Sequence, residues 1–369
     1  MNVPKLRFKE FNDEYNNVKL KEVAEIYDGT HETPNYIEQG VKFVSVENIS
    51  NLLDTKKYIS ESDFDNYKVK PKYNDVFMTR IGNIGTSSIY KSDEKLAFYV
   101  SLALLRSKNS NILVPDYLNQ YIKNNSFQKE LHNKTIHVAF PQKINTGEIG
   151  ECKINFCSDK EQIKIANFLS LLDKKIELQT KKIEDLKLFK LCNYDNLFSN
   201  QIREVKLKNI SKIEKGKQFN NELLIENGSY YMLNGGVSPS GYTNEYNTNE
   251  NTITISEGGN SCGYVNFNKN KFWCGGHCYK VIPNGINNNY LYHNLKYNEK
   301  KIMDLRVGSG LPNIQKKDIE NFKISIHNEN EQLKISNYFD RYDLKIELEE
   351  LKLNKLMELK NGLMQNMFV

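Results

Sequence analysis

Two stretches of the chain place their apolar residues at alternating steps of four and three. In residues 159–198 these steps run from Ile165 to Lys190, and in residues 328–368 they run from Ile335 to Lys360. Such a heptad pattern is typical of a long helix that packs against another helix. Neither stretch contains proline. Each predicts a helix of about 35–40 residues, or roughly 50–60 Å at 1.5 Å per residue.

The apolar positions of these two patterns form the expected helix–helix interface. They are Ile165, Leu169, Leu172, Ile176, Ile183 and Leu186 in the first stretch, and Ile335, Phe339, Tyr342, Ile346, Leu353 and Leu356 in the second. Polar residues interrupt both patterns at matching places, Gln179 and Lys190 in the first and Glu349 and Lys360 in the second. We therefore expect the helices to pair as an antiparallel coiled coil, rather than to pack separately on their own domains.

The helices belong to an internal repeat. Residues 161–178 match residues 331–348 at ten of 18 positions, with a constant offset of 170. Upstream, residues 18–30 match residues 205–217 at six of 13 positions, with an offset of 187. The segments between these matches share no evident similarity. Duplication followed by drift would also leave a repeat, but similarity confined to the ends favours one architecture that presents two different surfaces.

The dissimilar middle segments predict mixed structure with long polar loops. We expect strands at 41–46, 97–106, 251–256 and 262–267, a strand followed by a glycine-rich turn at 75–88, and helices at 116–124, 126–132 and 290–303. The predicted fold class is therefore α+β, with two globular, mixed α/β domains separated by the two long helices in a pseudo-twofold internal repeat. The expected boundaries are 1–157 for the first domain (with an N-terminal segment 1–16), 158–199 for the first helix, 200–327 for the second domain and 328–369 for the second helix.

Composition narrows the class of protein. The chain has 369 residues, of which 39% are hydrophobic and 11% aromatic, so a disordered chain is excluded. No apolar run is long enough for a membrane span, and no signal peptide is evident. Six cysteines are too few for a disulfide scaffold and suit reduced thiols, so we expect a cytoplasmic protein. A net charge of +5 permits a nucleic-acid partner without requiring one.

The sequence contains none of the catalytic motifs that we sought. No proline has a proline neighbour, which excludes the Asn/Asp-Pro-Pro-aromatic motif of amino methyltransferases. The only Gly-Lys pair, Gly216-Lys217, is followed by Gln218 and so is not a Walker A loop. Neither H-E-x-x-H nor G-x-S-x-G occurs. Together these absences favour a binding protein over an enzyme.

Four residues raise the question of a metal site. They are Cys262, Cys274, His277 and Cys278. Their spacing is not that of a common zinc knuckle, and joint ligation by adjacent His277 and Cys278 is awkward. We expect small buried thiols and a turn after Trp273 instead, with no metal bound.

Several short segments resemble a known family. They are 3–11 (VPKLRFKEF), 28–36 (DGTHETPNY), 79–85 (TRIGNIG) and 100–106 (VSLALLR), then 235–243 (GGVSPSGYT), 256–267 (SEGGNSCGYVNF), 272–279 (FWCGGHCY) and 308–319 (GSGLPNIQKKDI). Together with the duplicated helices, they make the whole chain similar to the specificity (S) subunit of type I restriction-modification systems, the HsdS family. The first domain departs from the family pattern at residues 139–143, where a turn like that at 308–312 is usual.

The resemblance implies a non-catalytic subunit with two target-recognition domains, each of which reads one half of a bipartite double-stranded DNA site. It implies that the helices set the spacer between the half-sites and dock two modification subunits, which are adenine methyltransferases. A restriction subunit is a further implied partner, and no membrane is involved. S-adenosylmethionine is expected in the modification subunit, and no cofactor in this chain.

Candidate DNA contacts are polar residues in the loops, because Arg and Asn side chains can form paired hydrogen bonds with guanine and adenine. Arg80 and Asn83 lie in a glycine-flanked turn, where backbone can approach a duplex closely. The candidates are Thr30, His31, Lys68, Lys70, Arg80 and Asn83 in the first domain, and Ser238, Ser240, Tyr242, Asn260, Ser261, His277, Arg306 and Ser309 in the second. If Arg80 reads a base, Arg80→Ala should weaken binding by about 1–3 kcal/mol.

The residues alone leave two other interpretations open. One is a stand-alone DNA-binding regulator or architectural protein. The other is a coiled-coil scaffold with two ligand-binding lobes, for which DNA binding would depend only weakly on salt. The dissimilar middle segments favour the reader of a bipartite site over both.

Overall fold

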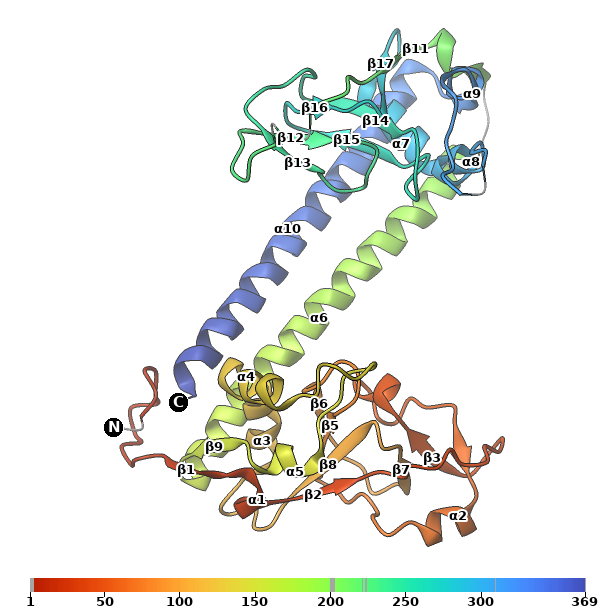
Figure 1. Ribbon diagram of the computed structural model, residues 1–369. Coiled ribbons are helices and arrows are strands. Elements are labelled where there is room, and N and C mark those ends of the chain that lie inside the picture. Colours follow the sequence, from red (N-terminus) through yellow and green to blue (C-terminus); the bar gives the residue numbers. More distant parts are fainter. Residues whose placement is uncertain (1–2, 200–202, 221, 223, 309, 369) are drawn as a thin grey trace. The chain divides into compact units, whose positions relative to one another are not determined.

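The long helices are the dominant feature of the computed structural model, which describes residues 3–199, 203–220, 222, 224–308 and 310–368 (Figure 1). Helix α6 (Asp159–Phe198) has 40 residues and helix α10 (Glu329–Met367) has 39, which confirms the two helices predicted from the heptad pattern. The chain divides into two compact units. Unit 1 is Met1–Gln179 with Lys352–Val369, and unit 2 is Thr180–Leu351, so each unit contains part of both helices. Among the described residues, no helix is long and apolar enough to cross a membrane.

Unit 1 contains three small sheets. Its elements before α6 are β1 (Asn16–Lys19), α1 (Leu20–Val23), β2 (Ala24–Asp28), β3 (Val41–Val44), η1 (Val46–Asn48), β4 (Tyr58–Ile59), α2 (Glu61–Asn66), β5 (Val76–Thr79), β6 (Ser87–Ile89), β7 (Leu96–Phe98), β8 (Leu102–Ser107), α3 (Pro115–Ile122), α4 (Asn125–Lys134), α5 (Thr146–Gly150) and β9 (Lys153–Phe156). The strand orders are β2-β8-β5-β6, β4-β3-β7 and β1-β9. All pairings are antiparallel except that of β3 with β7.

The four-stranded sheet of unit 1 is buried on both faces. Along β8, Ala103 and Leu105 face a core shared with α3, α4 and the long helices, while Leu102 and Leu104 face a second core that includes β7. Successive side chains of a strand point to opposite faces, so a strand between two cores has no polar face. This explains why the segment is a continuous apolar run.

Unit 2 repeats this arrangement. Its elements are β10 (Arg203–Lys206), η2 (Leu207–Asn209), β11 (Ser211–Lys215), β12 (Tyr230–Leu233), β13 (Gly241–Thr243), β14 (Thr252–Ser256), β15 (Val265–Asn268), β16 (Trp273–Cys274), β17 (Cys278–Pro283), α7 (Asn288–Tyr297), α8 (Glu299–Met303), α9 (Lys316–Asn321) and β18 (Lys323–Ile326). The strand orders are β11-β17-β14-β15, β13-β12-β16 and β10-β18, the same as in unit 1. The middle segments, which share no evident sequence similarity, therefore share one topology.

Two predicted elements are each divided in the structure. The strand expected at 97–106 is two strands, β7 and β8, because the chain turns between them and Leu102 N donates to Tyr99 O at 3.0 Å. The helix expected at 290–303 is two helices, α7 and α8. They meet at Asn298, whose side chain donates to Asn294 O at 2.9 Å.

The long helices run antiparallel, and their predicted interface is confirmed. Of its residues, Ile165, Leu169, Ile183, Ile335, Phe339 and Ile346 are buried, and Leu172, Ile176, Leu186, Tyr342, Leu353 and Leu356 are half-buried. Lys360 forms an ion pair with Asp173 in unit 1, and Lys190 forms one with Asp343 in unit 2. These two ion pairs are equivalent, because the offset of 170 relates Asp173 to Asp343 and Lys190 to Lys360.

A buried histidine joins α7 to both long helices within unit 2. His293 is fully buried, with Nδ1 2.8 Å from the Tyr194 hydroxyl and Nε2 3.0 Å from Asp340 Oδ1. A neutral imidazole satisfies both contacts, since Nδ1 accepts and Nε2–H donates. Burial lowers the pKa of His293 below its ordinary value of 6.5, and hydrogen bonding to Asp340 only partly offsets this effect.

Unit 2 is therefore expected to lose stability as the pH falls below about 6.5. The unfolded chain gains a proton on His293 near that pH, whereas the folded unit does not, so the free energy of unfolding falls by at most about 1.4 kcal/mol per pH unit. The only tryptophan, Trp273, lies in unit 2, so urea unfolding followed by its fluorescence measures this unit in the full chain.

The control for this prediction is His293→Gln. In unit 1 the corresponding helix carries Gln120, which donates to Asp173 at 2.9 Å and to Ser170 at 3.3 Å. The offset of 170 relates these acceptors to Asp343 and Asp340, so the variant copies an amide that the fold already uses. An unchanged pH dependence between pH 7.5 and 5 in His293→Gln would contradict the assignment.

Candidate nucleic-acid interface

Each unit contains a glycine-bearing turn between two neighbouring antiparallel strands. In unit 1, residues 79–86 join β5 to β6, and Gly85 N donates to Thr79 O at 3.0 Å. In unit 2, residues 256–264 join β14 to β15, and Gly263 N donates to Ser256 O at 2.9 Å. The two turns lie at the same place in equivalent sheets.

The turns require glycine at matching positions. Gly82 and Gly85 have φ of 82° and 90°, and Gly259 and Gly263 have φ of 74° and 88°. This left-handed region is readily available only to glycine. An exposed asparagine follows the first left-handed glycine of each turn, Asn83 after Gly82 and Asn260 after Gly259.

A second loop lies on the turn of unit 1. Gly82 N donates to Gln142 O at 2.8 Å, and Ile144 N donates to Arg80 O at 3.0 Å. The second loop, residues 136–143, includes the segment that departs from the family pattern. Backbone hydrogen bonds hold it against the turn, so its place does not depend on its side chains.

The equivalent loop of unit 2, residues 307–313, is held in the same way. Gly259 N donates to Pro312 O at 3.0 Å, and Ile314 N donates to Glu257 O at 2.9 Å. The backbone pattern is therefore common to both units, although the loop sequences differ.

Arg80 lies beneath the turn of unit 1. Only 6% of the residue is exposed. Its Nε donates to Ile144 O at 3.0 Å, Nη1 donates to Val100 O at 3.3 Å, and Nη1 also pairs with the carboxylate of Asp28. The buried guanidinium uses Nε and Nη1 within unit 1, so this geometry favours a structural role for Arg80 over the predicted contact with a base.

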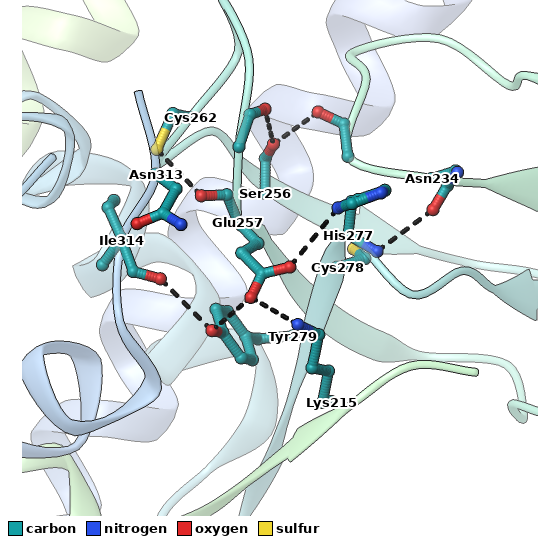
Figure 2. Close-up of polar contacts among 12 residues, drawn as sticks. Lys215, Asn234, Ser256, Glu257, Cys262, His277, Cys278, Tyr279, Asn313 and Ile314 are labelled. Carbon is teal, nitrogen blue, oxygen red and sulfur yellow. Dashed lines mark hydrogen bonds and ion pairs between the residues drawn. The ribbon is translucent and has the colours of Figure 1, made fainter. Parts of the chain in front are cut away.

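Glu257 lies at the same place in unit 2 (Figure 2). Its Oε1 accepts from Lys215 Nζ at 2.6 Å and from the Tyr279 hydroxyl at 2.8 Å, and its Oε2 lies 3.5 Å from His277 Nδ1. Burial acts to raise the pKa of Glu257, but the hydrogen bonds from Lys215 and Tyr279 outweigh it, so the pKa lies below its ordinary value. The carboxylate is therefore ionised at neutral pH.

The ion pair beneath the turn has opposite polarity in the two units. Arg80 and Glu257 occupy one backbone position, and the offset of 187 relates their partners Asp28 and Lys215. In unit 1 the cation lies on the turn and the anion at the end of β2, whereas in unit 2 the anion lies on the turn and the cation at the end of β11. One scaffold therefore holds two different arrangements of charge.

Comparison with known proteins agrees with this duplicated architecture. The model of the type I restriction modification DNA specificity domain matches residues 12–188 and again residues 200–358. The chain belongs to this family.

The similar proteins agree with the assignment. A putative type I specificity subunit of Mycoplasma pneumoniae is 35% identical over 161 residues, which are 42% of each chain. One of Mycoplasma genitalium is 34% identical over 139 residues, 37% of this chain and 36% of the relative. These matches thus span less than half of the relatives' length.

Solved structures show the same fold over the full length. The S subunit of a type I restriction-modification system from M. genitalium has a TM-score of 0.71 at 20% identity, over 100% of this chain and 99% of that one. A chain from a structure on complex assembly and conformational transition of a type I system has a TM-score of 0.57 at 14% identity, over 95% and 96%.

In this member of the type I DNA specificity domain family, most of the residues that we predicted to contact DNA are accessible. His31, Lys68, Asn83, Ser238, Ser240, Tyr242, Asn260, His277 and Arg306 are exposed, and Thr30, Lys70 and Ser261 are half-buried. Ser309 lies outside the described residues. The role of these residues in DNA binding, that of Arg80 included, stays a prediction.

The structure brings some of these candidates together. Thr30, His31 and Lys68 line a cavity of about 380 Å³ in unit 1, and His31 Nε2 lies 3.0 Å from the Asp28 carboxylate that also pairs with Arg80. His277 lies beside Glu257 in unit 2.

Other candidates lie elsewhere. Lys70 pairs with Asp65 at 3.2 Å and does not line that cavity. Ser240 and Tyr242 belong to the connection and strand that follow β12, in the three-stranded sheet of unit 2. Ser240 and Tyr242 therefore belong to a different sheet from the strands that the glycine turn of unit 2 joins.

Sequence reasoning missed Asp28, Lys215 and Glu257. The sequence did contain a signal. The offset of 187 aligns Lys215 with Asp28, and a reversed charge at two aligned positions suggests that the charges of their partners are reversed as well. The cysteines Cys262, Cys274 and Cys278 are buried, as expected. In the described part of the chain, no group of three or more His, Cys, Asp or Glu side chains is placed to hold a metal ion.

Proposed function

We propose that this chain is the DNA sequence-specificity subunit of a type I restriction-modification complex, and that each domain reads one half of a bipartite double-stranded site. The observation that carries the proposal is the pair of equivalent turns, whose backbone is shared and whose side chains differ even in charge. A protein that read the same sequence twice would need the same side chains twice. Because the side chains on the shared backbone differ, we infer that the two half-sites have different sequences.

The exposed residues of the long helices are evidence for the proposed docking of two modification subunits. Large apolar residues stay exposed at positions related by the offset of 170, namely Ile163 and Leu333, Leu178 and Leu348, and Phe189 and Leu359. Large apolar side chains are typical of the contact surfaces between proteins. Their duplication supports two copies of one partner.

In this proposal the chain itself is non-catalytic and cytoplasmic. The modification subunits carry S-adenosylmethionine and methylate adenine, and a restriction subunit is a further partner. The helices set the spacer between the two half-sites.

The decisive experiment is a map of methylated adenines. The chain is expressed with its modification subunit in a host without adenine methylation, and N6-methyladenine is located by single-molecule sequencing. We expect a bipartite motif with a fixed gap, absent when this chain is omitted. Replacing residues 17–157 by another recognition domain should change one half of the motif only, and the matched replacement of residues 203–327 should change the other half.

Other outcomes would support other functions. A change in both halves after one replacement would contradict the assignment of one domain to one half-site. A soluble complex that methylates nothing would favour a stand-alone DNA-binding protein or a scaffold. Direct selection of DNA sequences by the purified chain would then separate these two.

A further inference from the structure

The two loops that lie on the glycine turns carry apolar side chains in full contact with water. In residues 136–143, Phe140 is fully exposed and Val138 is 98% exposed. In residues 307–313, Leu311 is 88% exposed. Single exposed apolar residues are common on protein surfaces, but their recurrence at the same place in both units suggests a binding partner.

Backbone hydrogen bonds fix both loop bases. Ile136 N donates to Lys143 O at 2.8 Å. Gly82 N, in the turn that bears Asn83, donates to the carbonyl oxygen of Gln142, the residue before Lys143. In unit 2, Val307 and Asn313 exchange two backbone hydrogen bonds of 2.9 and 3.0 Å. Each apolar side chain therefore stands beside the turn with the candidate base-reading asparagine.

The charge around these side chains indicates the class of partner. Residues 135–147 and residues 305–317 contain no Asp or Glu. Exposed cationic residues flank both tips, Lys143 in unit 1 and Arg306, Lys316 and Lys317 in unit 2. Loops that carry cations and no acidic residue complement the phosphates of a duplex. DNA is therefore favoured over a protein partner at these tips.

We propose that Phe140 in the first domain and Leu311 in the second determine specificity by packing on the C5-methyl group of a thymine in the major groove. Among the groups that distinguish base pairs in the major groove, this methyl is the apolar one. Asn83 and Asn260, beside the tips, would supply hydrogen bonds to neighbouring bases. The inference rests on the proposed function, since it names a base contact within each half-site.

The test uses the complete complex of this chain with its modification subunits and the site defined by methylation mapping. Each thymine of the half-site read by the first domain is replaced in turn by uracil, which lacks only the methyl group. We expect one replacement to weaken binding about fourfold, the effect of one buried methyl group. Phe140→Ala should weaken binding to the thymine duplex about equally and should remove the preference for thymine over uracil.

Two further variants serve as controls. Phe140→Leu keeps an apolar tip and should retain a preference for thymine. Leu311→Ala should remove a preference for thymine in the other half-site only. Because Phe140 and Leu311 are exposed, these changes should leave the fold and the binding of the unaltered half-site intact.

Three results would overturn the inference. One is a thymine preference that is equal in wild type and Phe140→Ala. Another is a half-site without any A·T pair. The third is a Phe140→Ala variant that binds DNA normally but loses a modification subunit, which would make the tip a protein contact. Failure of the proposed function itself would appear differently, as a complex with no sequence-specific methylation at all.

Discussion

Replacing Arg80 by methionine is expected to lower the free energy of unfolding of unit 1 by about 3 kcal/mol and to weaken binding of specific and scrambled DNA equally. The change leaves the acceptors Ile144 O and Val100 O without their donors and removes the partner of Asp28. Asp28 is about one-third exposed and stays partly hydrated, so the loss lies near the lower end for a broken buried pair. Hydrogen exchange of the β5 and β8 amides measures the effect within unit 1.

The control for Arg80 is Asn83→Ala in the same turn. Asn83 is exposed, so its loss should change the stability of unit 1 by less than about 0.5 kcal/mol. If Asn83 reads a base, this variant weakens binding to the specific duplex alone. Arg80→Met with normal stability and a selective loss of specific binding would restore the original interpretation of Arg80 as a base contact.

Unit 2 provides a second control. Arg80→Glu places a buried carboxylate beside Asp28 and should destabilise unit 1 more than Arg80→Met does. Adding Asp28→Lys recreates the polarity that Lys215 and Glu257 show in unit 2. The double variant should recover part of the stability lost in Arg80→Glu, because opposite charges again face each other. If the double variant recovers no stability, the geometry around the ion pair, rather than its charge, is specific to each unit.

Phe198→Ala is expected to destabilise unit 2 by about 3–5 kcal/mol, as large core truncations do. Phe198 is 4% exposed, and its ring stacks on Tyr297 and Phe339 with centroid distances of 5.5 and 5.9 Å. Truncation therefore removes the centre of an aromatic cluster that joins α6 to α10. Urea unfolding followed by the fluorescence of Trp273 measures the loss.

Phe368→Ala is the matched variant in unit 1, since the offset of 170 relates Phe368 to Phe198. Phe368 is 6% exposed and packs edge-on against Tyr117 and Tyr121, with centroid distances of 5.5 and 5.4 Å. We expect a similar loss, measured by hydrogen exchange of α3, with the fluorescence transition of unit 2 unchanged. A Phe198→Ala variant as stable as wild type would contradict the role of the aromatic cluster.

The long helices were predictable because their evidence is local. A heptad pattern is repeated many times along one segment, and each of its predicted apolar positions is buried or half-buried in the structure. The shared topology of the middle segments was not predictable. Their strands are only two to six residues long, and a strand such as β8 is buried on both faces and so shows no alternation.

The candidate site was predictable only in part. The turn geometry follows from local glycines, and Asn83 and Asn260 lie at its exposed positions. The role of Arg80 depends on Asp28, 52 residues away along the chain, and no local pattern reveals that partner. The division of the predicted strand at 97–106 also has a distant cause, since Val100 N donates to Thr30 O at 2.9 Å.

The ion pairs between the long helices have an evolutionary consequence. Lys360 contacts Asp173 and Lys190 contacts Asp343, so each helix carries the acid of one contact and the base of the other. A surface that contains both halves of its own contact is self-complementary, as in a symmetric dimer. Two copies of a single repeat would therefore carry the contacts needed to pair as the two halves of this chain do. In a fused chain the middle segment of each repeat is free to differ, as it does here, while the joining surface stays the same.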